Sequence, residues 1–129
     1  VARTVALADG LPVLAGGKSM GGRMASIIAD DISADALVCL GYPFYAAGKP
    51  EKPRVAHLAE LKAPTLIFQG ERDALGNRET VETYSLSRQI NIHWVPTANH
   101  DLKPLKAAGV SYAACLQTAA EQIAGFLSE

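Results

Sequence analysis

The chain has 129 residues, of which 49% are hydrophobic, and a formal net charge of −1 at pH 7. This length suits one domain with a modest core, and the balanced charge excludes a nucleic-acid-binding surface or an acidic tail. No apolar stretch approaches the roughly 20 residues that a membrane-spanning helix needs. Cys39 and Cys115 lie in apolar or helix-like segments, which predicts a reducing, cytoplasmic setting rather than a disulfide framework.

Apolar runs in chain order predict four strands, at residues 12–16, 36–41, 65–70 and 90–95. The first three are apolar at nearly every position, which is typical of strands buried on both faces, whereas the fourth alternates and is expected nearer an edge. Helix-like stretches accompany them at residues 21–30, 54–61, 79–88 and 110–127. This alternation predicts an α/β fold, with a parallel sheet covered by helices on both faces. Residues 1–8 are expected to be the tail of an element that begins upstream.

The first strand leads into Gly17-Lys18-Ser19-Met20-Gly21, which fits the pattern G-x-S-x-G. In that pattern the serine sits on a strained turn between a strand and a helix, and a Cβ two residues to either side is expected to collide with its neighbours. The turn presents the serine hydroxyl above the carboxyl end of the sheet. The sequence therefore predicts an accessible nucleophile at Ser19.

Ser19, Asp73 and His100 each follow a predicted strand, and ligands of such sheets bind at the carboxyl ends of the strands. A serine hydroxyl becomes a good nucleophile when a histidine accepts its proton and a carboxylate orients that histidine. Taken singly, the serine fits a helix cap, the aspartate a turn and the histidine a loop. Together, in the chain order Ser, Asp, His, they predict a catalytic triad.

Other residues fit these roles less well. His57 falls inside a predicted helix, where a surface or half-buried histidine is the simpler interpretation, and His93 falls in the middle of a predicted strand. Glu71 is close enough to Asp73 to be an alternative acid, but Asp73 lies further into the loop. Asp101 adjoins His100 and is expected to point away from its ring.

Gly17-Lys18-Ser19 also suggests a phosphate-binding loop, which needs the pattern G-x-x-x-x-G-K-[ST]. Pro12 occupies the position of the first glycine, and an apolar strand replaces the loop. Nucleotide binding is therefore disfavoured, and a change at Lys18 or at Ser19 would distinguish the two interpretations. No spacing typical of metal ligands or of a dinucleotide-binding motif occurs, so no cofactor is expected.

These residues resemble the α/β-hydrolase superfamily, and within it the dienelactone-hydrolase-like enzymes and the branch of predicted hydrolases that includes testis-expressed proteins. The resemblance extends over essentially the whole chain and is carried by residues 16–23, 40–44, 65–73 and 99–102. It implies that Ser19 is the nucleophile, Asp73 the acid and His100 the base. It also implies that the amide of Met20 donates to an oxyanion hole.

The chain departs from this family before the turn at Ser19, where family members carry several strands. The resemblance therefore implies a single partial domain over residues 1–129, an α/β-hydrolase fold lacking its N-terminal strands. The loop that supplies a second oxyanion donor would also be missing, and residues 13–15 would form an exposed apolar edge. We expect either a fragment of a longer hydrolase, which we favour, or a second copy or partner that covers this edge.

The expected activity is that of a serine hydrolase acting on an ester, a thioester or a similar small acyl substrate. Tyr42, Phe44 and Tyr45 follow a strand end and are expected either to line the acyl pocket or simply to pack the loop. Lys18 and Arg23 are further candidates for the substrate pocket, and Arg23 would hold a carboxylate or form a surface ion pair. The alternative is a non-catalytic, hydrolase-like interaction module that binds a partner along the exposed edge.

Overall fold

The computed structural model describes residues 12–128. Its sheet has four parallel strands, which follow one another in chain order: β1 (Leu14–Lys18), β2 (Ala36–Leu40), β3 (Thr65–Gly70) and β4 (Ile90–Val95). The predicted parallel sheet is confirmed, and β4 lies at an edge as expected. The first strand begins later than predicted and runs through Gly17 and Lys18, because these residues pair in register with Cys39 and Leu40 of β2.

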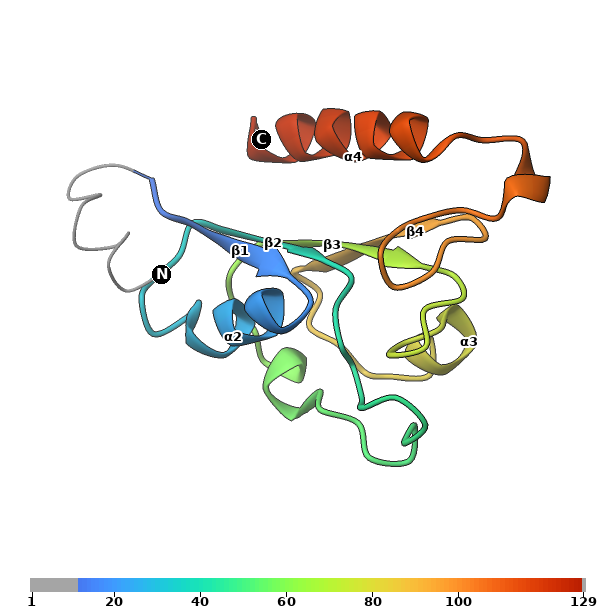
Figure 1. The fold of residues 1–129 in the computed structure, drawn as a ribbon. Coiled ribbons are helices and arrows are strands. Elements are labelled where there is room, and N and C mark those ends of the chain that lie inside the picture. The colour runs from blue at the N-terminus through green and yellow to red at the C-terminus, as the bar shows by residue number, and fades with distance from the viewer. Residues whose placement is uncertain (1–11, 129) are drawn as a thin grey trace.

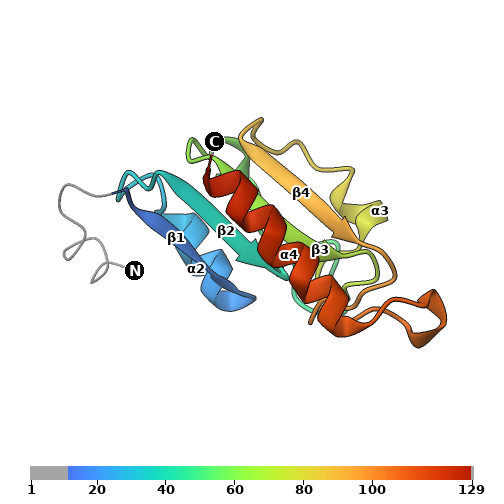
Figure 2. The ribbon, with the colours of Figure 1, turned by 90° about the horizontal axis from the view of Figure 1, so that it is seen from above.

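Helices cover both faces of the sheet (Figure 1). Helix α2 (Met20–Ile28) and the short 3₁₀ turn η1 (Ala56–Ala59) lie on one face, and α4 (Tyr112–Leu127) lies on the other. Figure 2 shows that α4 runs along the middle of the sheet and leaves β1 uncovered on that face. A short helix, α3 (Arg78–Val81), precedes β4, and a second 3₁₀ turn, η2 (Lys106–Ala108), precedes α4.

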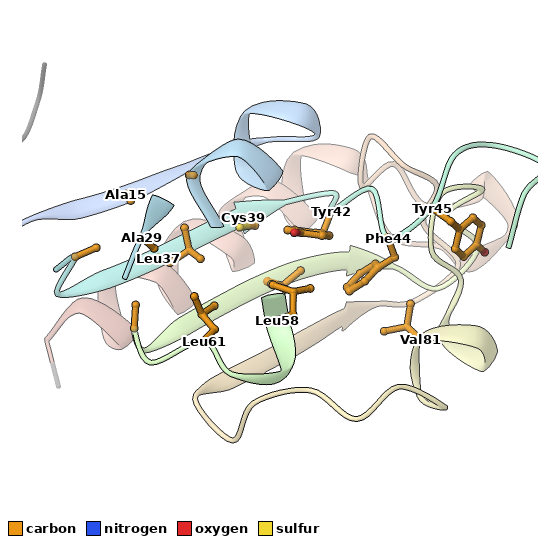
Figure 3. Packing of buried hydrophobic residues seen from close by; sticks show 14 residues of the cluster. Ala15, Ala29, Leu37, Cys39, Tyr42, Phe44, Tyr45, Leu58, Leu61 and Val81 are labelled. Carbon is orange, nitrogen blue, oxygen red and sulfur yellow. The ribbon is translucent and has the colours of Figure 1, made fainter. Parts of the chain in front are cut away.

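The buried apolar side chains form two clusters, one on each face of the sheet. The larger cluster packs α2 and η1 against the strands and includes Leu37, Ile67 and Leu58, none of which is accessible to solvent (Figure 3). The smaller cluster lies beneath α4 and includes Phe68 and Ala119. Among the described residues, β3 is therefore packed on both faces, whereas β1 is packed on the α2 face alone.

The helix predicted at residues 54–61 is wrong, since only η1 forms there. Its turn is closed by the Leu58 amide, which donates to the Val55 carbonyl three residues earlier. The next turn cannot continue, because the Asp30 carboxylate accepts the backbone amides of Lys62 and Ala63 and directs the chain into β3. Burial of Leu58 is achieved with a single turn.

The helix predicted at residues 79–88 is also much shorter than expected. Asn77 caps α3 by accepting the amide of Thr80, but the helix ends at Val81 once that side chain is buried. Ser87 then bonds to η1 and the segment after it, since its amide donates to Leu58 and its hydroxyl to Leu61. Tertiary hydrogen bonds therefore override the helical pattern in this segment.

No helix within residues 12–128 is long and apolar enough to cross a membrane. The upstream tail expected at residues 1–8 lies outside the described residues.

Candidate active site

The turn between β1 and α2 carries Ser19 in a backbone conformation that side chains rarely adopt, with φ 51° and ψ −121°. Its amide donates to the Leu40 carbonyl at 2.8 Å, which ties the turn to the end of β2. A Cβ at Gly17 would lie 2.7 Å from the Gly21 backbone, and one at Gly22 would lie 2.7 Å from the Gly17 carbonyl. The expected collision at Gly21 itself is wrong, because a Cβ there meets no described atom within 4 Å.

The structure brings Ser19, His100 and Asp73 together in one hydrogen-bonded row. Ser19 Oγ lies 2.8 Å from His100 Nε2, and His100 Nδ1 lies 2.8 Å from Asp73 Oδ2. An ionised carboxylate only accepts hydrogen bonds, so the ring proton of a neutral His100 must be on Nδ1. The lone pair of Nε2 then faces the serine hydroxyl, which is the geometry of a general base beside a nucleophile.

Asp73 is completely buried at the end of β3. Burial raises the pKa of Asp73 from its ordinary value, and the hydrogen bonds from the Leu75 amide and from His100 oppose that effect. The carboxylate also accepts a hydrogen bond from Gln69 Nε2 at 3.1 Å. A buried carboxylate with donors on both oxygens is suited to orienting an imidazole and to stabilising its protonated form.

The loop that carries His100 rests on two glycines at the ends of neighbouring strands. Gly41, which follows β2, has φ +66°, and a Cβ there would lie only 2.5 Å from the His100 carbonyl oxygen. A Cβ at Gly70, the last residue of β3, would lie 2.2 Å from the Asn99 carbonyl oxygen. Both contacts are tighter than any side chain permits, so these positions admit only glycine while the loop stays in place.

Two further predicted residues flank the row. Met20 is the first residue of α2, so its backbone N–H has no acceptor within the helix and is available to an oxyanion. Lys18 forms an ion pair with Asp101 at 3.1 Å, and both side chains are mostly exposed. As expected, Asp101 is directed to this partner rather than to the His100 ring. A role of Lys18 in substrate binding stays a prediction.

The prediction that Tyr42, Phe44 and Tyr45 line an acyl pocket is wrong. Tyr42 and Phe44 are inaccessible to solvent and Tyr45 is 3% exposed, because all three belong to the larger core cluster (Figure 3). The backbone after Gly41 turns these rings toward the η1 side of the sheet, where Tyr42 and Phe44 pack with centroids 4.8 Å apart. They are packing residues.

A second serine–histidine contact lies on the α2 side of the sheet. Ser26 Oγ is 2.9 Å from His57 Nε2 and 2.7 Å from the Tyr42 hydroxyl, and it donates to the Arg23 carbonyl at 2.6 Å. Ser26 is only 2% exposed, and no carboxylate among the described residues bonds to His57. Burial and the charge of Arg23 lower the pKa of His57. This cluster has the properties of a buried structural network rather than of a nucleophile.

Arg23, the other predicted pocket residue, is half-buried beside this network. Its Nε has no hydrogen-bond partner among the described residues. A role in holding a substrate carboxylate stays a prediction.

The disfavoured alternatives do not reach the row. His93 lies in β4 with its ring 5.2 Å from that of Phe68. Glu71 accepts the Thr97 amide and pairs with Arg78. Residues 14–18, where a phosphate-binding loop would lie, form strand β1, as expected. Within residues 12–128, no group of three histidine, cysteine, aspartate or glutamate side chains is arranged to hold a metal ion.

Comparison with known proteins assigns the fold. An alpha/beta-hydrolase domain family matches residues 1–128. Similar solved structures include a serine hydrolase homologue from Coxiella burnetii (17% identity, TM-score 0.63) and a lidless serine hydrolase from Xanthomonas campestris (19%, 0.59). A third is a serine hydrolase involved in carbazole degradation, the CarC enzyme (17%, 0.64).

The alignments with these three structures cover 85%, 78% and 91% of this chain and 47%, 44% and 64% of theirs, respectively. The chain thus spans about half the length of the first two. No curated protein sequence matches it. The family match over nearly the whole chain, together with the parallel sheet, shows that the chain belongs to the α/β-hydrolase superfamily.

Proposed function

We propose that the chain is the nucleophile-bearing part of a serine hydrolase that acts on an ester, a thioester or a similar small acyl substrate. The observation that carries this proposal is the unbroken row of hydrogen bonds from Ser19 through His100 to the buried Asp73. The strained turn at Ser19 supports it, because such strain persists where the surrounding structure holds a functional side chain in place. The similar structures from Coxiella burnetii and Xanthomonas campestris, a serine hydrolase homologue and a lidless serine hydrolase, support the same chemistry.

In this mechanism Ser19 Oγ attacks the substrate carbonyl while His100 Nε2 takes the hydroxyl proton. The Met20 amide donates to the oxyanion that forms. His100 then returns the proton to the leaving group, which leaves an acyl group on Ser19, and a water molecule activated by His100 releases it. One oxyanion donor contributes about 2.7–4 kcal/mol to lowering the barrier. A second donor, supplied by a segment outside residues 12–128, would therefore strengthen the activity greatly.

A fluorophosphonate probe tests the proposal, because it labels only an activated serine. We expect labelling of the wild-type chain and its loss in Ser19→Ala. Ser26→Ala is the matched control, since Ser26 also touches a histidine but is buried, and this variant should still be labelled. Absence of labelling in the wild type under native conditions, or loss of labelling in Ser26→Ala alone, would contradict the proposal.

The second candidate function is a hydrolase-like interaction module that binds a second copy along the β1 edge. Among the described residues, β1 pairs only with β2. Leu14, Met20, Met24 and Ile27, on or next to this edge, are each between 42% and 53% exposed. An unpaired apolar strand edge is an open template for another strand.

The cytoplasmic setting expected from the cysteines belongs to the proposal as well, and both cysteines are free in the structure.

Sedimentation velocity over about 1–100 µM separates these candidates, a range typical of weak association. Self-pairing predicts a sedimentation coefficient that rises with concentration and falls back in Leu14→Lys. Val110→Lys is the control, because Val110 is similarly exposed but lies between η2 and α4. A wild-type chain that stays monomeric throughout would contradict self-pairing.

A further inference from the structure

Gln69 is a fully buried polar side chain in a strand whose six residues are all buried. A primary amide in such a position is costly unless its polar atoms are hydrogen-bonded. Its Oε1 accepts the Tyr42 amide at 2.7 Å, and its Nε2 lies 3.0–3.1 Å from three oxygens: the Tyr42 carbonyl, the Gly76 carbonyl and Asp73 Oδ2. The buried side-chain amide of β3 therefore contacts Asp73, the acid of the triad.

The orientation of this amide follows from its partners. Tyr42 N–H can only donate, so the oxygen of Gln69 must face it. The other end faces two carbonyls and a carboxylate, which only accept, so it must be the NH₂ group. A methionine or leucine of similar size would leave Asp73 without this donor.

Asp73 Oδ2 receives two hydrogen bonds, one from His100 Nδ1 at 2.8 Å and one from Gln69 Nε2 at 3.1 Å. The Leu75 amide occupies Oδ1 at 2.7 Å. Gln69 thus shares the oxygen that orients the base. It also fixes the turn that carries Asp73, because it bonds to Gly76 at the end of that turn.

We propose that Gln69 is a positioning residue of the triad that acts through Asp73: by donating to Asp73 Oδ2, it moderates the pull of this carboxylate on the His100 ring proton. This proposal rests on the proposed hydrolase function. Without the Gln69 donor, the negative charge on Oδ2 is compensated by His100 alone. The Asp73–His100 hydrogen bond becomes stronger and the protonated imidazole more favourable, so His100 serves as a base only at higher pH.

The test compares Gln69→Met and Gln69→Leu with Thr65→Val. Thr65 is an equally buried polar residue of β3 on the same face, and its hydroxyl bonds to Ala63, far from Asp73. Neither methionine nor leucine carries a hydrogen-bond donor, so both variants remove the bond to Asp73 Oδ2. Two apolar variants of similar volume protect the test against the failure of one to fold.

The first readout is the low-field proton NMR resonance of His100 Nδ1–H, which needs no turnover. We expect it to move downfield in both Gln69 variants and to stay at the wild-type position in Thr65→Val. The second readout is the pH dependence of fluorophosphonate labelling, whose acidic limb should move to higher pH in the Gln69 variants alone.

Wild-type spectra and pH profiles in both folded Gln69 variants would overturn the proposal, as would an equal change in Thr65→Val. If the wild type is not labelled, the hydrolase proposal fails while the NMR experiment still decides the role of Gln69. If the wild type is labelled and neither readout changes, only the role of Gln69 fails.

Discussion

Replacing Gly41 with alanine should uncouple the base from the nucleophile with little damage to the rest of the fold. The added Cβ would lie 2.5 Å from the His100 carbonyl oxygen and 3.5 Å from its ring. Real Cβ contacts of this kind are longer than 3.0 Å, so the His100 loop must retreat by about half an ångström or more. Misplacement of a catalytic group by about 1 Å can cost about 100-fold in rate, so we expect labelling of Ser19 to slow by about 10- to 100-fold.

The same substitution also strains the backbone, because Gly41 has a left-handed conformation that costs other residues about 1–2 kcal/mol. Gly48→Ala separates the two effects. Gly48 has φ +77°, but a Cβ added there would meet no described atom within 4 Å. This variant should therefore lose similar stability and keep its labelling rate.

The assay is the rate of fluorophosphonate labelling, with thermal unfolding of each variant measured alongside. Equal rates for Gly41→Ala and Gly48→Ala in folded protein would refute the view that Gly41 seats the base. If Gly41→Ala fails to fold while Gly48→Ala folds, the close approach of Gly41 to His100 is needed for folding and not only for placing the base. In that case, His100 NMR signals in a mixture of folded and unfolded chains would still report whether the folded fraction keeps its ring in place.

Three further predictions follow from single residues. Asp73→Asn should lower the turnover number by about 10⁴-fold, as measured with a chromogenic ester, because an amide favours the wrong histidine tautomer; a loss under tenfold would contradict the role of Asp73. Since the pKa of His57 is lowered in the folded chain, the unfolded chain takes up its proton first, so the free energy of unfolding should decrease as pH falls below 6.5. Denaturant titrations should show a weaker decrease in His57→Gln, and an unchanged pH dependence would contradict this reasoning. Burial raises the pKa of Cys39 to about 12, so a thiol reagent should modify Cys115 in the native chain and Cys39 only after unfolding, as peptide mass mapping would show.

Much of the fold could be predicted from local patterns. Apolar runs identify the four strands, and the alternating pattern of β4 correctly marks an edge strand. Burial of the first strand on both faces, expected from its apolar run, is wrong: in β1 only Ala15 is buried, because β1 is the other edge of the described sheet and α4 does not cover it (Figure 2). The short helices at residues 56–59 and 78–81 could not be predicted. Their lengths depend on hydrogen bonds that the Asp30 carboxylate accepts from, and that Ser87 donates to, residues distant in the chain, and no local propensity encodes those contacts.

The site divides in the same way. Ser19, Asp73 and His100 could be found because each follows a strand, and parallel strands bring their carboxyl ends to one edge. Gln69 was missed, although a glutamine in an otherwise apolar strand is an unusual choice that marks the position. The prediction that the aromatic residues after β2 line a pocket is wrong, because the end of a strand predicts the position of the following backbone but not the face of the sheet to which its side chains point.

The order of residue types along the chain by itself determined the family, the parallel sheet and the three residues that meet at its edge, because apolar runs and tight-turn patterns are formed by residues close together in the chain. Only the tertiary structure decided which histidine meets which serine. Ser26–His57 and Ser19–His100 are equally close contacts, at 2.9 and 2.8 Å. Partial exposure of the serine and a buried carboxylate behind the histidine distinguish the second pair. Both depend on packing between segments that are distant in the chain, since His100 lies 81 residues from Ser19 and 27 from Asp73.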